Sequence, residues 1–297
     1  MAGALAVDHI AHFVPDLAAA SAVLEAMGFA LTPRSEQRNR QADGTLVPAG
    51  AANRCAMLGK GYLEFLTPVE GAGAPPTPIA AELRAAIARR AGIHLLAFGS
   101  AAIDSDRQRL AAGGFAPLAP VALQRTFATP DGETTARFTV LRVPAGAMAE
   151  GRVQFVHHHT PEAIWQPRWL GHANGAVGLA GVVIAADAPA QAARRYALFT
   201  GLAVEGEVFP TIRTARGVVV FAPADHPAGT GLWRPGTVAA SIIACRELAT
   251  FAACGERAGC AVRGIGGGAT LTLPPAVGGT MIAIEAVASI DTIFSAP

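Results

Sequence analysis

One order of predicted elements, a strand, a helix and then three strands (βαβββ), recurs along this chain. The first copy begins with the strand VDHIAHFV (7–14), continues with a helix over 17–27 and ends with the short strand GYLEFL (61–66). The second copy begins with GIHLLAF (92–98) and ends with GRVQFV (151–156). One copy covers only one face of its sheet with its helix, so two copies side by side can close a curved sheet around a cavity. The repeat therefore predicts a cavity that receives side chains from the first and last strands of both copies.

Two weaker copies follow in the second half, one starting near Ala176 and one near Thr237. The sequence therefore predicts an α+β fold of four βαβββ modules paired into two domains. We expect the polar segment RSEQRNRQADG (34–44) of the first copy to be a loop. The predicted boundaries are an N-terminal domain over 1–160, a connector over 161–175 and a C-terminal domain over 176–297.

Composition excludes several classes of protein. Hydrophobic residues make up 52% of the chain and charged residues 15%, which is typical of a globular protein with a large core. The net charge of +1 gives no electrostatic reason to expect nucleic acid or a membrane as a partner. The start of the chain lacks the basic region of a signal peptide, and the most apolar stretch, 176–186, is too short to span a bilayer. Four cysteines without a CxxC pair predict a reduced, cytoplasmic protein.

Four polar residues stand at matching places in the first two copies. Each first strand holds a histidine, His9 or His94, and each last strand holds a polar residue, Glu64 or Gln154. The intervals are 55 residues in the first copy and 60 in the second. Two imidazoles with oxygen donors suit Zn, Ni, Co, Mn or Fe(II). The pattern predicts one divalent transition metal, held by these four side chains.

A structural role is the alternative for each residue. Side chains alternate along a strand, so His12 lies on the face opposite His9 and is expected to be structural. His9 would then be a hydrogen-bonded core histidine, and Gln154 part of a hydrogen-bonded wall. Glu64 is costly to bury among apolar neighbours without a cation or a partner, unless its strand lies at an edge facing water.

Two further residues are candidates for substrate binding. His158 shares strand parity with Gln154 and is expected to line the cavity, or even to replace a ligand, unless the run of histidines at 157–159 is an exposed loop. Arg54, in the strand before Glu64, is a candidate for holding an anionic substrate group, although an ordinary surface arginine is the favoured interpretation.

The segments VDHIAHFVPDLAAASAVLEAMGF and NRCAMLGKGYLEFLTP resemble the opening module of the vicinal oxygen chelate superfamily, in particular its glyoxalase-like domain branch. The resemblance implies a divalent metal held by the first and last strands of paired modules, with His9, Glu64, His94 and Gln154 at the ligand positions. Glutamine departs from the commonest pattern, in which this ligand is a carboxylate.

The second half departs further from that pattern. Ala180 stands where the first half has His9, the fourth copy has no histidine in its first strand, and Glu285 keeps a carboxylate near a last-strand position. We therefore expect one metal cavity, in the first half. Four-module extradiol dioxygenases generally keep their metal in the second half, which counts against that class.

The resemblance implies a glyoxalase-like lyase or isomerase that is metal-dependent and acts on a small oxygen-bearing substrate through an enolate-type intermediate, with Glu64 as the general base. One alternative is an Fe(II)-dependent extradiol-type dioxygenase. The other is a non-catalytic protein of the same fold that binds or sequesters a small molecule. The family resemblance also implies a homodimer as one arrangement of the chain.

Overall fold

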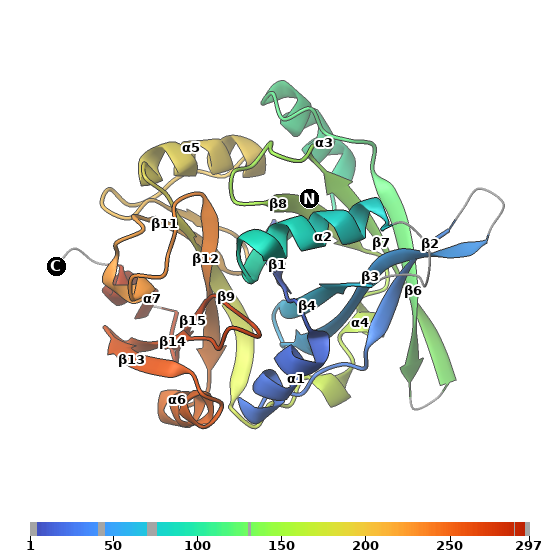
Figure 1. Ribbon diagram of the computed structural model, residues 1–297. Helices are drawn as coiled ribbons and strands as arrows, with labels where there is room; N and C mark the ends of the chain where they lie inside the picture. The colour runs from blue at the N-terminus through green and yellow to red at the C-terminus, as the bar shows by residue number, and fades with distance from the viewer. Residues whose placement is uncertain (1–4, 41–44, 70–75, 130–131, 288, 295–297) are drawn as a thin grey trace.

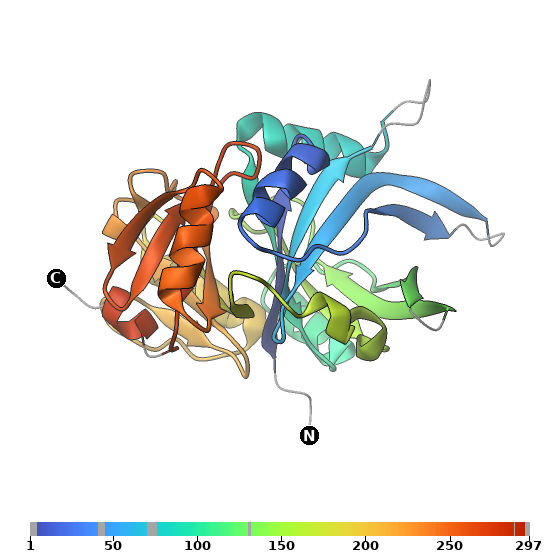
Figure 2. The same cartoon turned by 90° about the horizontal axis from the view of Figure 1, so that it is seen from below.

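The computed structural model of the chain describes residues 5–40, 45–69, 76–129, 132–287 and 289–294. Figures 1 and 2 show two lobes side by side, one coloured blue to green and the other yellow to red. Each lobe is built on its own β-sheet.

The first lobe contains an eight-stranded sheet in the order β2-β3-β4-β1-β5-β8-β7-β6. Its elements are β1 (Ala6–Phe13), α1 (Leu17–Ala26), β2 (Ser35–Arg40), β3 (Leu46–Met57), β4 (Tyr62–Pro68), α2 (Pro78–Arg89), β5 (Gly92–Gly99), α3 (Ile103–Ala112), β6 (Val121–Thr129), β7 (Gly132–Arg142) and β8 (Arg152–His158), followed by α4 (Pro161–Ile164) and η1 (Pro167–Trp169).

The second lobe contains a seven-stranded sheet in the order β10-β11-β9-β12-β15-β14-β13. Its elements are β9 (Ala176–Ala185), α5 (Pro189–Thr200), β10 (Thr211–Arg213), β11 (Val218–Ala222), η2 (Pro227–Gly229), β12 (Thr237–Cys245), α6 (Leu248–Arg257), β13 (Ala261–Ile265), β14 (Gly268–Thr272), β15 (Thr280–Ile284) and α7 (Ser289–Ile293).

The first sheet has an internal two-fold arrangement. Strands β1 and β5 pair antiparallel at its centre, while β4 runs parallel to β1 and β8 runs parallel to β5. Each module thus contributes its first and last strands to the middle of the sheet, as the repeat predicts. This arrangement brings residues distant in sequence onto one concave face.

The residues around α1, the helix that follows β1, explain where this helix begins and ends. The Asp16 carboxylate accepts hydrogen bonds from the backbone N–H groups of Ala18 and Ala19, which caps the start of α1. Leu17 and Leu24 are buried on one face of the helix. Gly28, with φ of +85°, takes the left-handed conformation just after the helix and turns the chain.

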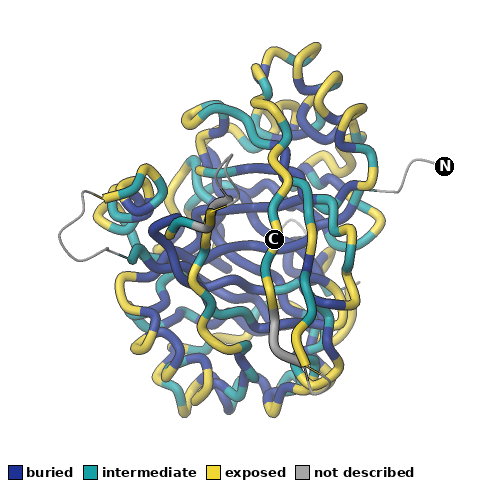
Figure 3. The backbone as a smooth tube through the Cα atoms, turned by 90° about the vertical axis from the view of Figure 1, so that its right-hand side faces the viewer, coloured by how far each residue is buried: buried dark blue, intermediate teal, exposed yellow. Residues whose placement is uncertain are grey.

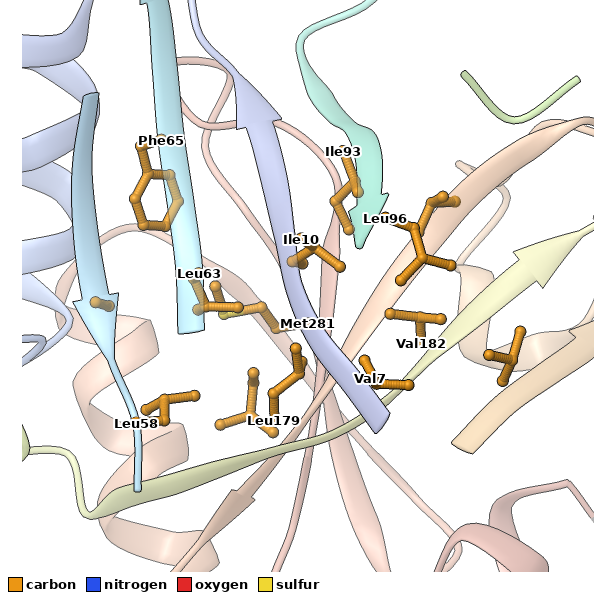
Figure 4. Packing of buried hydrophobic residues seen from close by; sticks show 14 of the residues in the cluster. Val7, Ile10, Leu58, Leu63, Phe65, Ile93, Leu96, Leu179, Val182 and Met281 are labelled. Carbon is orange, nitrogen blue, oxygen red and sulfur yellow. The ribbon is translucent and has the colours of Figure 1, made fainter. Parts of the chain in front are cut away.

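The other face of the first sheet packs against the second lobe. Figure 4 shows Ile10 and Leu63 of the first sheet close to Met281 and Leu179 of the second, and Leu96 beside Val182. These side chains belong to one large cluster of buried hydrophobic residues that spans both lobes. Figure 3 shows that many of the buried residues lie in the central strands. One face of β1 is thus committed to this shared core, and the other is left for the cavity.

Two parts of the repeat differ from the prediction. The segment predicted as a polar loop forms β2, which pairs antiparallel with β3; its residues 41–44 lie outside the described part. As an edge strand, β2 needs no apolar alternation to be stable. In the third module two strands, β10 and β11, follow α5, and Glu205 forms an isolated bridge with Thr211 at the start of β10. Gly206, with φ of +79°, and Pro210, which has no N–H to donate, explain the interruption.

The second lobe fills its own concave face. A second buried cluster there includes Val183, Ile242 and Ile282 from the strands, together with Trp233 and Phe294. These large side chains occupy the space that corresponds to the cavity of the first lobe.

Candidate functional site

The concave face of the first sheet encloses a cavity of about 280 Å³. Side chains from both modules form its wall, and the connector after β8 contributes to its rim. The polar residues of the lining include His9, Asn53, Tyr62, Glu64, Arg125, Arg142, Arg152, Gln154, His158 and Gln166, and the apolar ones include Met57, Leu66, Leu95, Phe138, Val140, Val156 and Trp169.

The carboxylate of Asp8 holds both histidines of the cavity wall. Asp8 Oδ1 lies 2.7 Å from His9 Nδ1 and 3.1 Å from His158 Nε2. The pairing of β1 with β5 skips Asp8 between Val7 and His9, so a β-bulge breaks the usual alternation of side chains here. The bulge allows two consecutive residues to take part in one site.

The charge of Asp8 fixes the hydrogen positions on these rings. Burial by itself raises the pKa of Asp8, but the hydrogen bonds and charges of His158 and His9 outweigh it, and the pKa lies well below its usual range. An ionised carboxylate only accepts hydrogen bonds, so His9 Nδ1 and His158 Nε2 both carry hydrogen. In the neutral His9 ring, Nε2 is then the nitrogen with a lone pair.

Glu64 faces the same cavity with its own donor. The Asn53 side-chain amide of β3 donates a hydrogen bond to Glu64 Oε1, and both residues are buried. The Tyr62 ring, two residues before Glu64 on β4, stacks on His9 with ring centroids 4.3 Å apart. Burial and the negative charges of Asp8 and Glu64 raise the pKa of Tyr62, so it stays a phenol. The alternative of an edge position facing water therefore does not hold for Glu64, which is buried on an inner strand of the sheet.

The opposite side of the cavity is cationic. Arg142 Nε donates to Gln154 Oε1 at 3.2 Å. Burial and the nearby charge of Arg152 lower the pKa of Arg142 to about 10, which still leaves it charged at neutral pH. Arg125 also lines the cavity, with its guanidinium 5.7 Å from the Phe138 ring centroid.

The structure does not bring His94 to this cavity. His94 Nε2 lies 2.8 Å from the Arg90 carbonyl oxygen, and the His94 ring stacks on Phe13 at 5.2 Å. Burial lowers the pKa of His94 to about 4. His94 lines a separate hollow beside α2, so the predicted grouping of His9, Glu64, His94 and Gln154 around one centre is not what the structure shows.

The strand register explains why. Ala11 pairs with Glu64 in the first module, and Ala97 pairs with Gln154 in the second, so Ala97 corresponds to Ala11. Two residues earlier stand His9 in β1 and Leu95 in β5. The residue equivalent to His9 is therefore Leu95, which faces the cavity, and His94 is the residue that the β1–β5 register skips.

Arg54 is also outside the cavity. Its Nε donates to the Thr32 carbonyl oxygen at 2.8 Å, and its Nη1 pairs with Glu25 Oε1 at 2.8 Å. The alternation of β3 accounts for this, because Asn53 and Cys55 face the cavity and Arg54 lies between them. The structure therefore places Arg54 outside this cavity, away from the position that the prediction requires.

The connector shapes the rim of the cavity. Trp165 Nε1 donates to the Leu58 carbonyl oxygen at 3.0 Å, and the Trp165 ring packs edge-on against Tyr62 and His158. Trp169 lines the cavity. Sequence reasoning missed Asp8, Arg142 and Arg125. An acidic residue next to a strand histidine was the one signal that could have found Asp8.

The donors around the cavity do not fit the four-ligand metal site. Leu95 replaces one imidazole, and the Gln154 amide oxygen already accepts from the Arg142 guanidinium, whose charge repels a cation. Among the described residues, no group of three or more His, Cys, Asp or Glu side chains is placed to hold a metal ion. His9 and Glu64 are the two positions that keep a ligand type of the expected set.

Comparison with known proteins identifies the family. The model of the glyoxalase-like domain matches residues 7–200, well over half of the chain. The protein belongs to this family, and its fold is that of the vicinal oxygen chelate superfamily, as the sequence resemblance predicts. No curated protein sequence matches the chain. No helix within the described residues is long and apolar enough to cross a membrane.

Solved structures show the same fold at low sequence identity. A hypothetical protein from Staphylococcus aureus matches with a TM-score of 0.64 and 10% identity, over 94% of this chain and 98% of that one. A Mn(II)-bound glyoxalase from Novosphingobium aromaticivorans matches with 0.56 and 10%, over 96% and 83%. A mutant of 4-hydroxymandelate synthase from Streptomyces coelicolor matches with 0.54 and 14%, over 97% and 96%.

Proposed function

We propose that this protein is a glyoxalase-like lyase or isomerase that moves a proton on a small oxygen-bearing molecule, with His9 as the general base. The observation that carries the proposal is the hydrogen bond between Asp8 and His9 Nδ1 in the cavity wall. A histidine oriented by a buried carboxylate presents its other nitrogen as a base. Leu95 and the Arg142–Gln154 contact support a reaction that does not use a four-ligand metal.

The proposed step conserves charge and protons. His9 Nε2 takes a proton from a carbon next to a carbonyl group, and the electrons of the broken C–H bond move to the carbonyl oxygen. The imidazolium that forms is stabilised by Asp8, which stays ionised. Glu64, oriented by Asn53, accepts a hydrogen bond from a substrate hydroxyl. Return of the proton to a different atom, or loss of a leaving group, completes an isomerase or a lyase reaction.

Deuterium exchange tests this proposal even when the product is unidentified. Chelator-treated protein would be incubated in D₂O with a panel of small hydroxy- and oxo-carbonyl compounds, and the loss of the signal of the carbon-bound proton would be followed by NMR. We expect wild type to catalyse exchange and His9→Gln to lower its rate by about 10²–10⁴. The matched control is His157→Gln on the outer face of β8, a residue that does not line this cavity. Exchange by His9→Gln at the wild-type rate would contradict the proposal.

A metal-dependent reaction is the second candidate. His9 and Glu64 both line the cavity, and the solved neighbours include a Mn(II)-bound glyoxalase and a protein titled as a fusion with 4-hydroxyphenylpyruvate dioxygenase. In this candidate one divalent metal binds at His9 and Glu64, and Glu64 serves as the general base. Exchange that chelator abolishes and Mn(II) restores would favour the glyoxalase type, and catechol-driven oxygen uptake with Fe(II) would favour the dioxygenase type. Stoichiometric ligand binding without any reaction would favour the non-catalytic binder.

A further inference from the structure

The two sides of the cavity carry opposite chemical character. On the side of the first module stand His9 and Glu64, a base and a carboxylate. On the side of the second module, the positions that the two-fold arrangement makes equivalent hold Leu95 and Gln154. Arg142, opposite Gln154 in the β7–β8 pair, takes the place that Cys55 has opposite Glu64. Where the first side has an imidazole, a carboxylate and a thiol, the second side thus has a leucine, an amide and a guanidinium.

Arg142 makes no ion pair among the residues that the structure describes, and the nearby negative charge of Glu82 is already paired with Arg152. Its Nε donates to Gln154, whereas the neighbouring Arg152 pairs with Glu82. A partly buried guanidinium that shares its nearest acidic neighbour with another arginine is costly to desolvate. An anion that enters the cavity would supply the missing charge, and a planar carboxylate matches the fork of N–H groups that a guanidinium presents.

Beside these polar groups, the second side also carries an apolar surface. Leu95, Val140, Val156 and Phe138 line it, and burial of a hydrocarbon surface against them is favourable by about 25 cal/mol per Å². His9 pairs with Ala97, and Ala97 pairs with Gln154, so the backbone of Gln154 lies two strands from that of His9, about 10 Å away at the usual strand spacing. A ligand held at Arg142 therefore reaches His9 if it has a body the size of one ring or a short chain.

We propose that the cavity takes a small organic carboxylate, with its carboxylate at Arg142 and Gln154 and its apolar body against Leu95, Phe138 and Val140. This inference rests on the proposed function only in that a small molecule occupies the cavity, and it names the chemical class of that molecule. It also assigns roles to the two sides: the second module holds the charged end, and the first module presents His9 to the reacting end.

The test is calorimetric titration of the full chain with matched probes. Phenylacetate is the anionic probe, phenylacetamide is its neutral analogue of nearly equal shape, and inorganic phosphate tests whether any anion suffices. We expect phenylacetate to bind at least tenfold more tightly than phenylacetamide or phosphate. Arg142→Met should lower the phenylacetate affinity at least tenfold, and Arg142→Lys should restore part of it. The matched control is Arg54→Met, which removes an arginine outside the cavity and should leave binding unchanged.

Three results would overturn the inference: equal affinity for the acid and the amide, wild-type affinity in Arg142→Met, or no binding of phenylacetate by wild type. Circular dichroism of each variant, together with binding of phenylacetamide, shows whether Arg142→Met is still folded. Failure here is distinct from failure of the proposed function. Loss of exchange in His9→Gln with unchanged phenylacetate affinity would support both, whereas normal exchange in His9→Gln with Arg142-dependent binding would leave this inference standing alone.

Discussion

At the scale of single residues, Asp8 connects the parts of the site. Its carboxylate contacts His9 and His158 from the cavity wall, and Arg216 Nη2 of the second lobe approaches Asp8 Oδ2 at 3.7 Å. A buried carboxylate with three basic neighbours is held ionised, and in turn it holds the rings in one orientation. The site therefore depends on a residue that does not itself line the cavity.

Asp8→Asn is expected to weaken both the fold and the proposed reaction. The folded-state pKa of Asp8 lies below its value in the unfolded chain, so the carboxylate stabilises the protein above about pH 4 and loses that contribution as the pH falls through the folded-state pKa. We expect the variant to lower the free energy of unfolding at about pH 7 by about 1–3 kcal/mol. Urea denaturation at about pH 7 and about pH 2 measures the effect. An equal deficit at both pH values would contradict this account of Asp8.

Several polar residues of the cavity could be predicted from the sequence, but the residues that contact them, Asp8 and Arg142, could not. Parity within the last strand of the second module correctly indicates that His158 and Gln154 share one face, and both line the cavity together with His9 and Glu64, which the repeat singled out. Metal ligation by these residues stays a prediction. Asp8 and Arg142 escaped prediction because a β-bulge and a pairing between β7 and β8 decide their positions, and neither is visible in a run of residues.

At the scale of elements, the register of β5 decides the chemistry of the cavity. One skipped residue in the β1–β5 pairing turns His94 out of the site and leaves Leu95 equivalent to His9. The histidine in the first strand of both repeats predicts a matched pair, but a shift of one residue moves a side chain to the other face of a strand. The fold class followed from the repeat because it needs only the element order, whereas the ligand set needs the register.

A register argument can be tested by restoring the missing ligand. Leu95→His with Gln154→Glu would place two imidazoles and two carboxylates at the four equivalent positions. We expect this double variant to bind Mn(II) or Zn(II) at least tenfold more tightly than wild type, as measured by competition with a chromophoric chelator. The matched control is Gln154→Glu alone, which leaves Leu95 in place. A gain that appears only when Arg142→Met is added would assign the repulsion to Arg142, whereas no gain in either variant would show that the assignment of Leu95 is wrong.

The buried face of β1 predicts a pH dependence of stability. Burial lowers the pKa of His12 to about 3, and contacts with the Val277 and Gly278 backbone offset this only in part. Below the ordinary value of 6.5 the unfolded chain takes up a proton that the folded chain does not, so stability falls as the pH falls from 6.5 towards 3. His94, whose pKa is about 4, adds to the same trend.

We therefore expect His12→Phe to flatten the fall of stability with decreasing pH. The slope should decrease by up to about 1.4 kcal/mol per pH unit, which corresponds to one proton. Urea unfolding at a series of pH values between about 7 and 4 measures it, with His159→Phe at an exposed position just after β8 as the control. The same slope in wild type and His12→Phe would mean that His12 does not carry the effect.

At the scale of the whole molecule, the two lobes share one hydrophobic core, and we expect them to unfold together. Leu179 and Met281 of the second lobe pack on the face of the first sheet opposite the cavity. The backbone N–H of Val7 donates to the Arg216 carbonyl oxygen at 2.9 Å, and that of Leu179 donates to the Lys60 carbonyl oxygen at 2.7 Å. The second lobe has filled its own concave face and supports the first sheet from behind.

Leu179→Ala is expected to destabilise both lobes together. Loss of this buried side chain should lower the free energy of unfolding by about 2–5 kcal/mol. Fluorescence of Trp233 reports on the second lobe, and that of Trp165 and Trp169 reports on the connector of the first. We expect both signals to change in one denaturation transition in Leu179→Ala as in wild type. Two separated transitions would show that the lobes are independent.

The central claim is that side chains, and not a four-ligand metal centre, do the chemistry of this cavity. Metal content tests it most directly, measured by mass spectrometry on untagged wild-type protein beside His9→Ala and Glu64→Ala after incubation with Mn(II), Zn(II), Ni(II), Co(II) or Fe(II) and gel filtration. Our account predicts well below one metal ion per chain in wild type and no difference in the two variants. About one transition metal per chain in wild type, lost in both variants, would contradict it and make the metal-dependent reaction the leading function.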